Sequence, residues 1–78
     1  MIKVQLFAAF AEFAGTREVL VPYRQGITCS DLWTTIREKY PKLSPIHPLF
    51  AIGKEYVPKE SVLKDGDAVL LFPPVSGG

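Results

Sequence analysis

Apolar and polar residues alternate in two short stretches near the N-terminus. The stretches span residues 2–7 and 17–22. Alternation at period two with β-branched residues is typical of a strand that buries one face. Consecutive strands joined by a short connection usually pair, so we predict two neighbouring strands, the second ending at Pro22. The apolar positions predicted to share the buried face are Ile2, Val4, Leu6, Val19 and Val21.

The connection between these strands is rich in alanine and has a helical period. Phe10 and Phe13 are three residues apart, and Gly15 follows. Glycine supplies the positive φ with which many helices end. We therefore predict one or two helical turns over residues 8–14.

The strongest helical pattern begins after Thr28, which is a suitable N-cap residue. Asp31 lies three residues further on, where a carboxylate favours the free amides at the start of a helix. Pro41 is expected to end the helix, because the residue before proline disfavours helical angles. At about 100° per residue, one third of the helix circumference carries the apolar side chains, which are Cys29, Leu32, Trp33, Ile36 and Tyr40.

Proline and turn residues divide the second half of the chain. We predict an extended, proline-stiffened loop over residues 43–48 and short strands over 49–52 and 55–57. Between these strands, Gly53-Lys54 fits a two-residue type II′ hairpin turn, which requires glycine at its first central position.

A second turn, Asp65-Gly66-Asp67, precedes the most apolar run of the chain at residues 68–72. A nearly continuous apolar strand is expected in the middle of a sheet, covered on both faces. The order of elements predicts an α+β fold in which one main helix packs on a mixed sheet. Residues 1–78 are expected to form a single domain with a C-terminal tail at 73–78.

Composition narrows the classes of function. A chain of 78 residues with 47% hydrophobic residues has the apolar content of one folded domain, which excludes an intrinsically disordered chain. A net charge of +1 provides no field for nucleic acid or an anionic membrane, and we expect neither as a partner. A single cysteine cannot form an internal disulfide, and no apolar run approaches the ~18 residues of a membrane span. These features favour a cytoplasmic protein.

The residues that often carry chemistry do not form a recognisable active site. Cys29 lies near a helix N-terminus, which can activate a thiol, but it falls within the apolar stripe and is expected to be an inert core residue. His47, the one histidine, lies between Pro45 and Pro48, and the sequence offers too few further ligands for zinc. No glycine-rich phosphate loop follows the first strand. We therefore expect this chain to bind no cofactor or metal and to have no active site of its own.

The C-terminal segment is more informative. Pro73 and Pro74 cannot continue the ladder of a central strand, so the sheet should end by Phe72. Six extended residues reach about 20 Å, and two glycines can enter a channel too narrow for a Cβ atom. The α-carboxylate of Gly78 would arrive at the end of such a channel. A frayed terminus is the alternative, but glycines that follow a proline-stiffened apolar segment favour a functional tail.

The segments Leu63-Lys-Asp-Gly-Asp67 and Val69-Leu-Leu-Phe-Pro-Pro-Val-Ser-Gly-Gly78 resemble the C-terminal signature of the small subunit of molybdopterin synthase. The opening Ile2-Lys-Val-Gln-Leu-Phe-Ala8 is similar to the start of the same family. The resemblance covers essentially the whole chain. Ala11 departs from the pattern, since members of the family often carry a basic residue there.

The resemblance implies a β-grasp, ubiquitin-like fold and a role as a sulfur carrier. In such a carrier, an E1-like adenylating enzyme uses ATP and magnesium to activate Gly78, and a sulfur donor converts it to a thiocarboxylate. The donor would be a cysteine desulfurase or a rhodanese-like protein. The sulfur then passes to cyclic pyranopterin monophosphate in the large catalytic subunit, with which the carrier is expected to form a heterotetramer. The implied partner contacts are Phe7, Phe72, Pro73, Pro74, Val75, Ser76 and Gly77.

Two other functions fit the same tail. The chain is alternatively a sulfur carrier for thiamine thiazole, cysteine or thiolated tRNA. It is also compatible with a ubiquitin-like modifier joined to lysines through Gly78, or with a plain binding module. A neighbouring gene for the large subunit would favour the first function, and isopeptide conjugates in cells would favour the modifier.

Overall fold

The computed structural model describes residues 1–74. Its elements follow closely the order expected from the sequence. The strands are β1 (Ile2–Leu6), β2 (Glu18–Val21), β3 (Leu49–Ile52), β4 (Glu55–Val57) and β5 (Ala68–Phe72), and the helices are α1 (Ala9–Ala14), α2 (Cys29–Lys39) and the 3₁₀-helix η1 (Pro41–Leu43).

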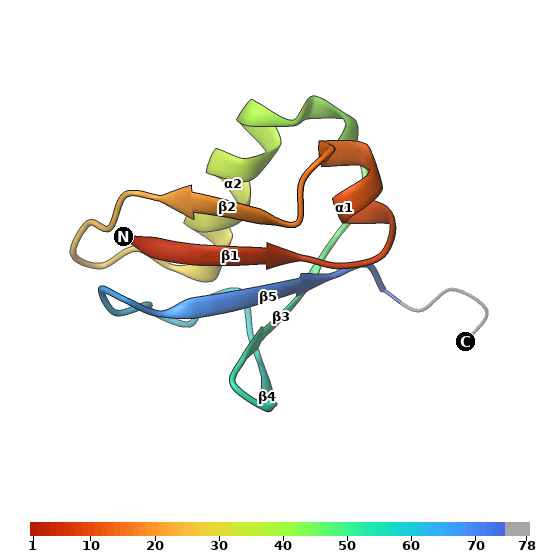
Figure 1. Ribbon diagram of the computed structural model, residues 1–78. Coiled ribbons are helices and arrows are strands. Elements are labelled where there is room, and N and C mark those ends of the chain that lie inside the picture. The colour runs from red at the N-terminus through yellow and green to blue at the C-terminus, as the bar shows by residue number, and fades with distance from the viewer. Residues whose placement is uncertain (75–78) are drawn as a thin grey trace.

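The five strands form one mixed sheet in the order β2-β1-β5-β3-β4 (Figure 1). The central strand β5 runs parallel to β1 and antiparallel to β3, and the outer pairs β1–β2 and β3–β4 are antiparallel. The predicted pairing of the first two strands and the central position of β5 are therefore confirmed, as is the α+β class.

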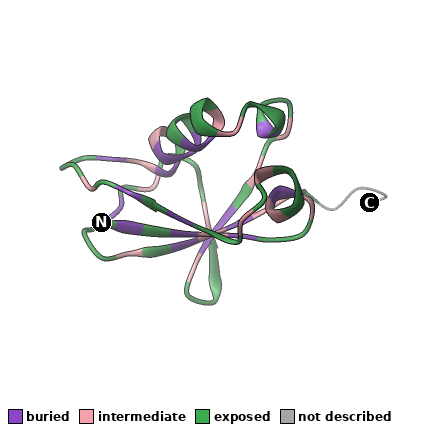
Figure 2. Cartoon of the chain, turned by 45° about the horizontal axis from the view of Figure 1, so that its top comes forward, coloured by how far each residue is buried: buried purple, intermediate pink, exposed green. Residues whose placement is uncertain are grey.

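The strand register places the predicted apolar residues in rows across one face of the sheet. Val4 lies opposite Val19 on β2 and Val69 on β5, and Val69 in turn lies opposite Ile52 on β3. Helix α2 lies over this face (Figure 2), and Leu32 is among its residues that belong to the hydrophobic core. The stripe predicted for α2 is correct: four of its five residues are buried, and Tyr40 packs half-buried at the edge of the core.

Helix α1 lies on the same side of the sheet as α2. Phe10 of α1 is fully buried, and its ring centroid is 5.4 Å from that of Trp33 on α2. Gly15 ends α1 with a φ of 75°, as its position predicted. Phe13, by contrast, is 47% exposed.

Because both helices pack on one side, no helix among residues 1–74 covers the other face of the sheet. The prediction that residues 68–72 are covered on both faces is wrong. Along β5, Val69 and Leu71 are buried, whereas Leu70 and Phe72 are only half-buried and Ala68 is exposed. The apolar run marks a central strand, but it does not indicate a second layer of helices.

The prediction of an extended loop over residues 43–48 is also wrong at its start. Residues 41–43 form η1, with proline at its first turn, and the Ser44 N–H donates to the Pro41 carbonyl at 3.0 Å. Proline suits the first turn of a helix because its missing N–H would have no partner there. Leu43 is thereby turned into the core and is fully buried. The turn Gly53-Lys54 agrees with its prediction, because Gly53 has a φ of 64° and Lys54 is not among the residues with positive φ.

Candidate functional site

The candidate site is the end of β5, where the chain leaves the sheet. Phe72 is the last residue of this strand and lies opposite Leu49 of β3. On the other side, the Phe7 N–H donates to the Leu71 carbonyl at 3.2 Å. Pro73 is half-buried and Pro74 is exposed. The expected partner-contact residues Val75, Ser76 and Gly77, and the reactive Gly78, lie outside the described residues.

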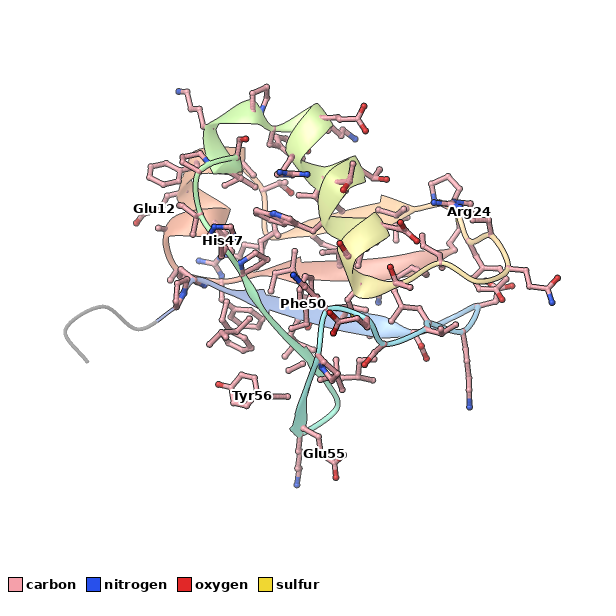
Figure 3. The ribbon with its side chains drawn as sticks, turned by 180° about the vertical axis from the view of Figure 1, so that it is seen from behind. Glu12, Arg24, His47, Phe50, Glu55 and Tyr56 are labelled. Atoms are coloured by element: carbon pink, nitrogen blue, oxygen red, sulfur yellow. The ribbon has the colours of Figure 1, made fainter. Side chains whose placement is uncertain are left out.

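Three aromatic rings gather where the chain leaves the sheet, and we call them the aromatic cluster: Phe7, Tyr56 and Phe72. The rings of Phe7 and Phe72 are stacked, with centroids 4.6 Å apart and an interplanar angle of 14°. The Tyr56 ring meets that of Phe72 edge-on, at 6.2 Å and 66°. Figure 3 shows Tyr56 on the side of the sheet away from α2. Phe7 and Phe72, two of the predicted contact residues, are thus brought together.

The aromatic cluster continues into the uncovered face of the sheet. Leu70 and Ala51 lie side by side in the register, and Ala51 lies opposite Tyr56. Leu49 and Tyr56 are 40% and 69% exposed. An uncovered apolar surface of this kind is typical of a protein-interaction site. We call it the open face and define it by Phe7, Leu49, Tyr56, Leu70 and Phe72; Ala51, which lies between Leu70 and Tyr56 in the register, is buried.

The connection from β1 to α1 makes a tight turn beside the aromatic cluster. Ala8 has φ 55° and ψ −131°, a backbone conformation that glycine adopts without strain and alanine does not. Next to this turn lies an open groove of about 670 Å³, lined among others by Phe7, Ala11, Glu12 and Arg17. Ala11, which departs from the family pattern, is half-buried in this groove.

Cys29 lies in the core, as predicted, and His47 lies at the surface. Cys29 is fully buried, and burial, with a smaller contribution from the negative charge of Asp67, raises the pKa of its thiol to about 11. The thiol is therefore protonated near neutral pH and closed to solvent. His47 is exposed between η1 and β3 (Figure 3). Among residues 1–74, no group of three His, Cys, Asp or Glu side chains is placed to hold a metal ion. The same part of the chain has no helix long and apolar enough to cross a membrane.

Sequence reasoning missed Tyr56 and Leu49 as parts of the site. Each belongs to a short strand whose apolar residues carry no signal of which face they occupy. The predicted hairpin at 53–54 contained the necessary information, because the position of the turn fixes the register in which Tyr56 meets Ala51. The sequence pattern could not establish that β3 and β4 lie beside β5.

Known proteins of one kind are similar to this chain over 99% of its length. Molybdopterin synthase sulfur carrier subunits are similar to it: that of Chlamydomonas reinhardtii is 40% identical, with 99% of this chain and 98% of the relative covered. The subunit of Homo sapiens is 34% identical, with 99% and 93% covered.

Two solved structures illustrate the similarity of the fold. The putative molybdopterin converting factor, subunit 1, from Pyrococcus furiosus has a TM-score of 0.85 at 31% identity, covering 95% of this chain and 97% of that one. SAMP1 from Haloferax volcanii has a TM-score of 0.84 at 31% identity, covering 99% and 98%. The model of the ThiS family matches residues 4–78. The chain therefore belongs to the ThiS family and has the β-grasp fold, which it shares with the putative molybdopterin converting factor, subunit 1.

Proposed function

We propose that this chain is the sulfur carrier subunit of a molybdopterin synthase, and that the carboxyl group of Gly78 carries the sulfur. The observation that carries the proposal is the likeness to relatives of that name over 99% of the chain, at up to 40% identity. The structure supports it with a central strand that ends at an uncovered apolar face, immediately before the Pro-Pro-Val-Ser-Gly-Gly segment.

The tail explains how a chain without an active site takes part in the reaction. A carboxylate is a poor electrophile, so an E1-like enzyme must first activate it. A Gly78 carboxylate oxygen attacks the α-phosphorus of ATP, with magnesium bound by the activating enzyme, and pyrophosphate leaves. A persulfide from a desulfurase or rhodanese-like donor then attacks the acyl carbon and expels AMP. A second thiol reduces the resulting acyl disulfide and releases the thiocarboxylate.

The thiocarboxylate sulfur is anionic and nucleophilic near neutral pH, which suits it to attack cyclic pyranopterin monophosphate. The acids and bases of that step would belong to a large catalytic subunit. We propose that this subunit docks on the open face and encloses the tail, with contacts from Phe7, Phe72, Pro73 and Pro74. A heterotetramer with two copies of each subunit follows from the family analogy. ATP and magnesium would be bound by the activating enzyme and not by this chain. We propose that the chain and its partners act in the cytoplasm.

A second candidate is supported by different neighbours. The small archaeal modifier protein 1 of Methanosarcina acetivorans has a TM-score of 0.79 at 30% identity, with 99% of this chain covered. An adenylated Gly78 is equally suited to form an amide with a lysine, because the same activated acyl carbon accepts an amine or a sulfur nucleophile. A sulfur carrier for another pathway of the ThiS family would use the same intermediate.

Intact-protein mass spectrometry tests the proposal. The chain is incubated with the activating enzyme, ATP, magnesium and a persulfide donor. We expect the native chain to exchange one oxygen atom for one sulfur atom and the Gly78 deletion to remain unchanged. Shortening the tail by one residue withdraws its end by about 3.3 Å, comparable to the ~3–3.5 Å separation of reacting atoms. Sulfur transfer to the pterin precursor by the truncated chain would refute the carrier role, and isopeptide conjugates without transfer would establish the modifier.

A further inference from the structure

We propose that Phe7 is a positioning residue whose ring, stacked on Phe72, sets the direction in which Pro73 and Pro74 leave the sheet. The inference deepens the proposed function and rests on it, because a direction for the tail matters only if the tail delivers a reactive end. It concerns contacts within this chain, which are present before any partner binds.

Backbone hydrogen bonds stop at this point of the molecule. The bond from the Phe7 N–H to the Leu71 carbonyl joins the end of β1 to β5. Pro73 and Pro74 have no N–H to donate, so neither can extend the ladder. Beyond the pairing of Phe72 with Leu49, the restraint on how the following residues leave the sheet must come from side-chain packing, and the ring of Phe72 is the largest side chain at this point.

The ring of Phe72 is held from two sides. Phe7 stacks on it at 4.6 Å and 14°, and Tyr56 meets it at 6.2 Å and 66°. Both arrangements are favoured by the charge distribution of aromatic rings. Phe7 directly follows β1 and Tyr56 lies on β4, and these two strands are on opposite sides of β5 in the sheet. A change in the side-chain torsion of Phe72 would therefore break one contact or the other.

Phe7 is itself fixed through both of its backbone polar groups. Its N–H binds the Leu71 carbonyl, and its carbonyl accepts from the Phe10 N–H at 3.2 Å. Phe10 is fully buried against the core. The backbone of Ala8, with φ 55° and ψ −131°, makes the turn that brings these two bonds together. Phe7 is thus tied both to the sheet and to α1, and its ring is a fixed reference for Phe72.

The two prolines transmit the direction that the stack sets. Successive prolines favour the polyproline II conformation, which rises about 3.1 Å per residue. A 20° swing at Phe72 would move the far end of a Pro-Pro unit of ~6 Å by roughly 2 Å. A misplacement of about 1 Å in a reacting group can cost ~10²-fold in rate. Loss of the stack is therefore expected to reduce delivery of Gly78 even where the partner still binds.

The first test uses the isolated chain and needs no sulfur chemistry. Dipolar couplings of the Cα–Hα bonds of Pro73 and Pro74 are measured in a weakly aligned sample of the native chain, Phe7→Leu, Phe7→Tyr and Phe13→Ala. Phe7→Leu keeps apolar volume but removes the ring, Phe7→Tyr keeps the ring, and Phe13 is an exposed phenylalanine outside the aromatic cluster. We expect the couplings to fall at least twofold in Phe7→Leu and to be retained in the other two variants. Unchanged couplings in Phe7→Leu would overturn the inference.

The second test separates positioning from binding. Single-turnover sulfur transfer is measured at a saturating concentration of the large subunit, together with the dissociation constant of the complex. We expect the saturated rate to fall tenfold or more in Phe7→Leu and to stay near the native rate in Phe7→Tyr and Phe13→Ala. A weaker affinity with an unchanged saturated rate would show that Phe7 acts as a partner contact only, and would refute the positioning role. If the native chain transfers no sulfur, the proposed function fails, while the dipolar couplings still decide whether Phe7 directs the tail.

Discussion

At the scale of single residues, the thiol of Cys29 should make folding stability depend on alkaline pH. Burial raises its pKa from 9.0 to about 11. In the unfolded chain the thiol ionises near its ordinary pKa, while in the folded chain it stays protonated. The buried, protonated thiol therefore lowers the stability of the fold at no pH below 9. As the pH rises from about 9 to 11, the unfolded chain releases the thiol proton and the folded chain does not, so the free energy of unfolding falls.

Denaturant titrations between pH 7 and 11 check this expectation, with Cys29→Ala as the control. The native chain should lose stability above pH 9 more steeply than the variant, because alanine has no proton to release. Parallel pH profiles for the two proteins would show that the thiol ionises equally in both states. The same burial predicts that a thiol reagent modifies Cys29 only after unfolding.

Ala8 offers a second test at the residue scale. Its backbone lies in a region that costs a non-glycine residue of the order of 1–3 kcal/mol. We expect Ala8→Gly to stabilise the fold by about 1 kcal/mol, since the relief of strain exceeds the added freedom of the unfolded chain. The matched control is Ala14→Gly within α1, where glycine should destabilise by about 0.5–1 kcal/mol. Thermal unfolding measures whether each variant is more or less stable than the native chain. A lower stability of Ala8→Gly would show that the backbone of Ala8 is not strained.

The strain at Ala8 also shows a limit of prediction from the sequence. Alanine has no preference for a positive φ, so the sequence contains no local signal of this turn. The turn follows from tertiary structure: β1 must end and Phe10 must reach the core within a few residues. At Gly15 and Gly53, by contrast, the residue type itself indicated the backbone conformation.

At the scale of elements, the start of α2 is held by a capping box. The Asp31 N–H donates to the Thr28 hydroxyl oxygen at 3.1 Å, and the Thr28 N–H donates to the Asp31 carboxylate at 3.1 Å. Each bond gives a partner to an amide that the helix itself leaves unpaired. We expect Thr28→Ala to lower the free energy of unfolding by about 1 kcal/mol.

Thr35→Ala is the matched control for this prediction. Thr35 is exposed in the same helix, and its replacement removes no cap. Urea titration should therefore separate the two variants, and equal stabilities would exclude a contribution from the box.

The Asp31 carboxylate of the capping box should make the folding stability depend on pH in the acid range. Hydrogen bonds from Thr28, the backbone one first, hold the pKa of Asp31 below its ordinary value of 3.8. The ionised Asp31 carboxylate therefore stabilises the fold fully at pH values above its ordinary pKa. This stabilisation is lost as the pH falls through the lowered pKa of the folded state. Asp31→Asn should therefore reduce the acid sensitivity of the fold, and acid titrations monitored by circular dichroism would detect it.

The elements themselves were largely predictable because each has a local cause. The N-cap and proline of α2, the alternation in β1 and the turns around glycine all lie within a few residues of the structure they determine. The 3₁₀-helix η1 and the open face were not predictable in this way. Whether Leu70 and Phe72 are covered depends on where α1 and α2 pack. The apolar sequence of β5 is compatible with helices on one face of the sheet or on both.

At the scale of the whole molecule, the buried core and the residue proposed to carry sulfur lie in separate parts of the chain. The buried hydrophobic core of the described residues extends from Ile2 to Leu71. The residue proposed for chemistry, Gly78, comes after it in the chain, at the end of the segment that begins at Pro73. Substitutions at the far end of the tail should therefore alter sulfur loading and transfer without altering the stability of the fold.

Gly77 gives the sharpest test of this separation. A Gly77→Leu variant should unfold at the native temperature, because position 77 lies beyond the strand and the core that the structure describes. It should nevertheless impair both thiocarboxylate formation and sulfur transfer, since a side chain must then enter channels that we propose admit bare backbone. Differential scanning calorimetry and intact-mass analysis measure the two effects on one preparation. The control is Val62→Leu, at an exposed residue outside the open face, which should leave both readouts unchanged. Normal sulfur loading of Gly77→Leu would mean that the activating enzyme accepts a side chain beside the reactive carbonyl, and the narrow-channel explanation of the two glycines would be wrong.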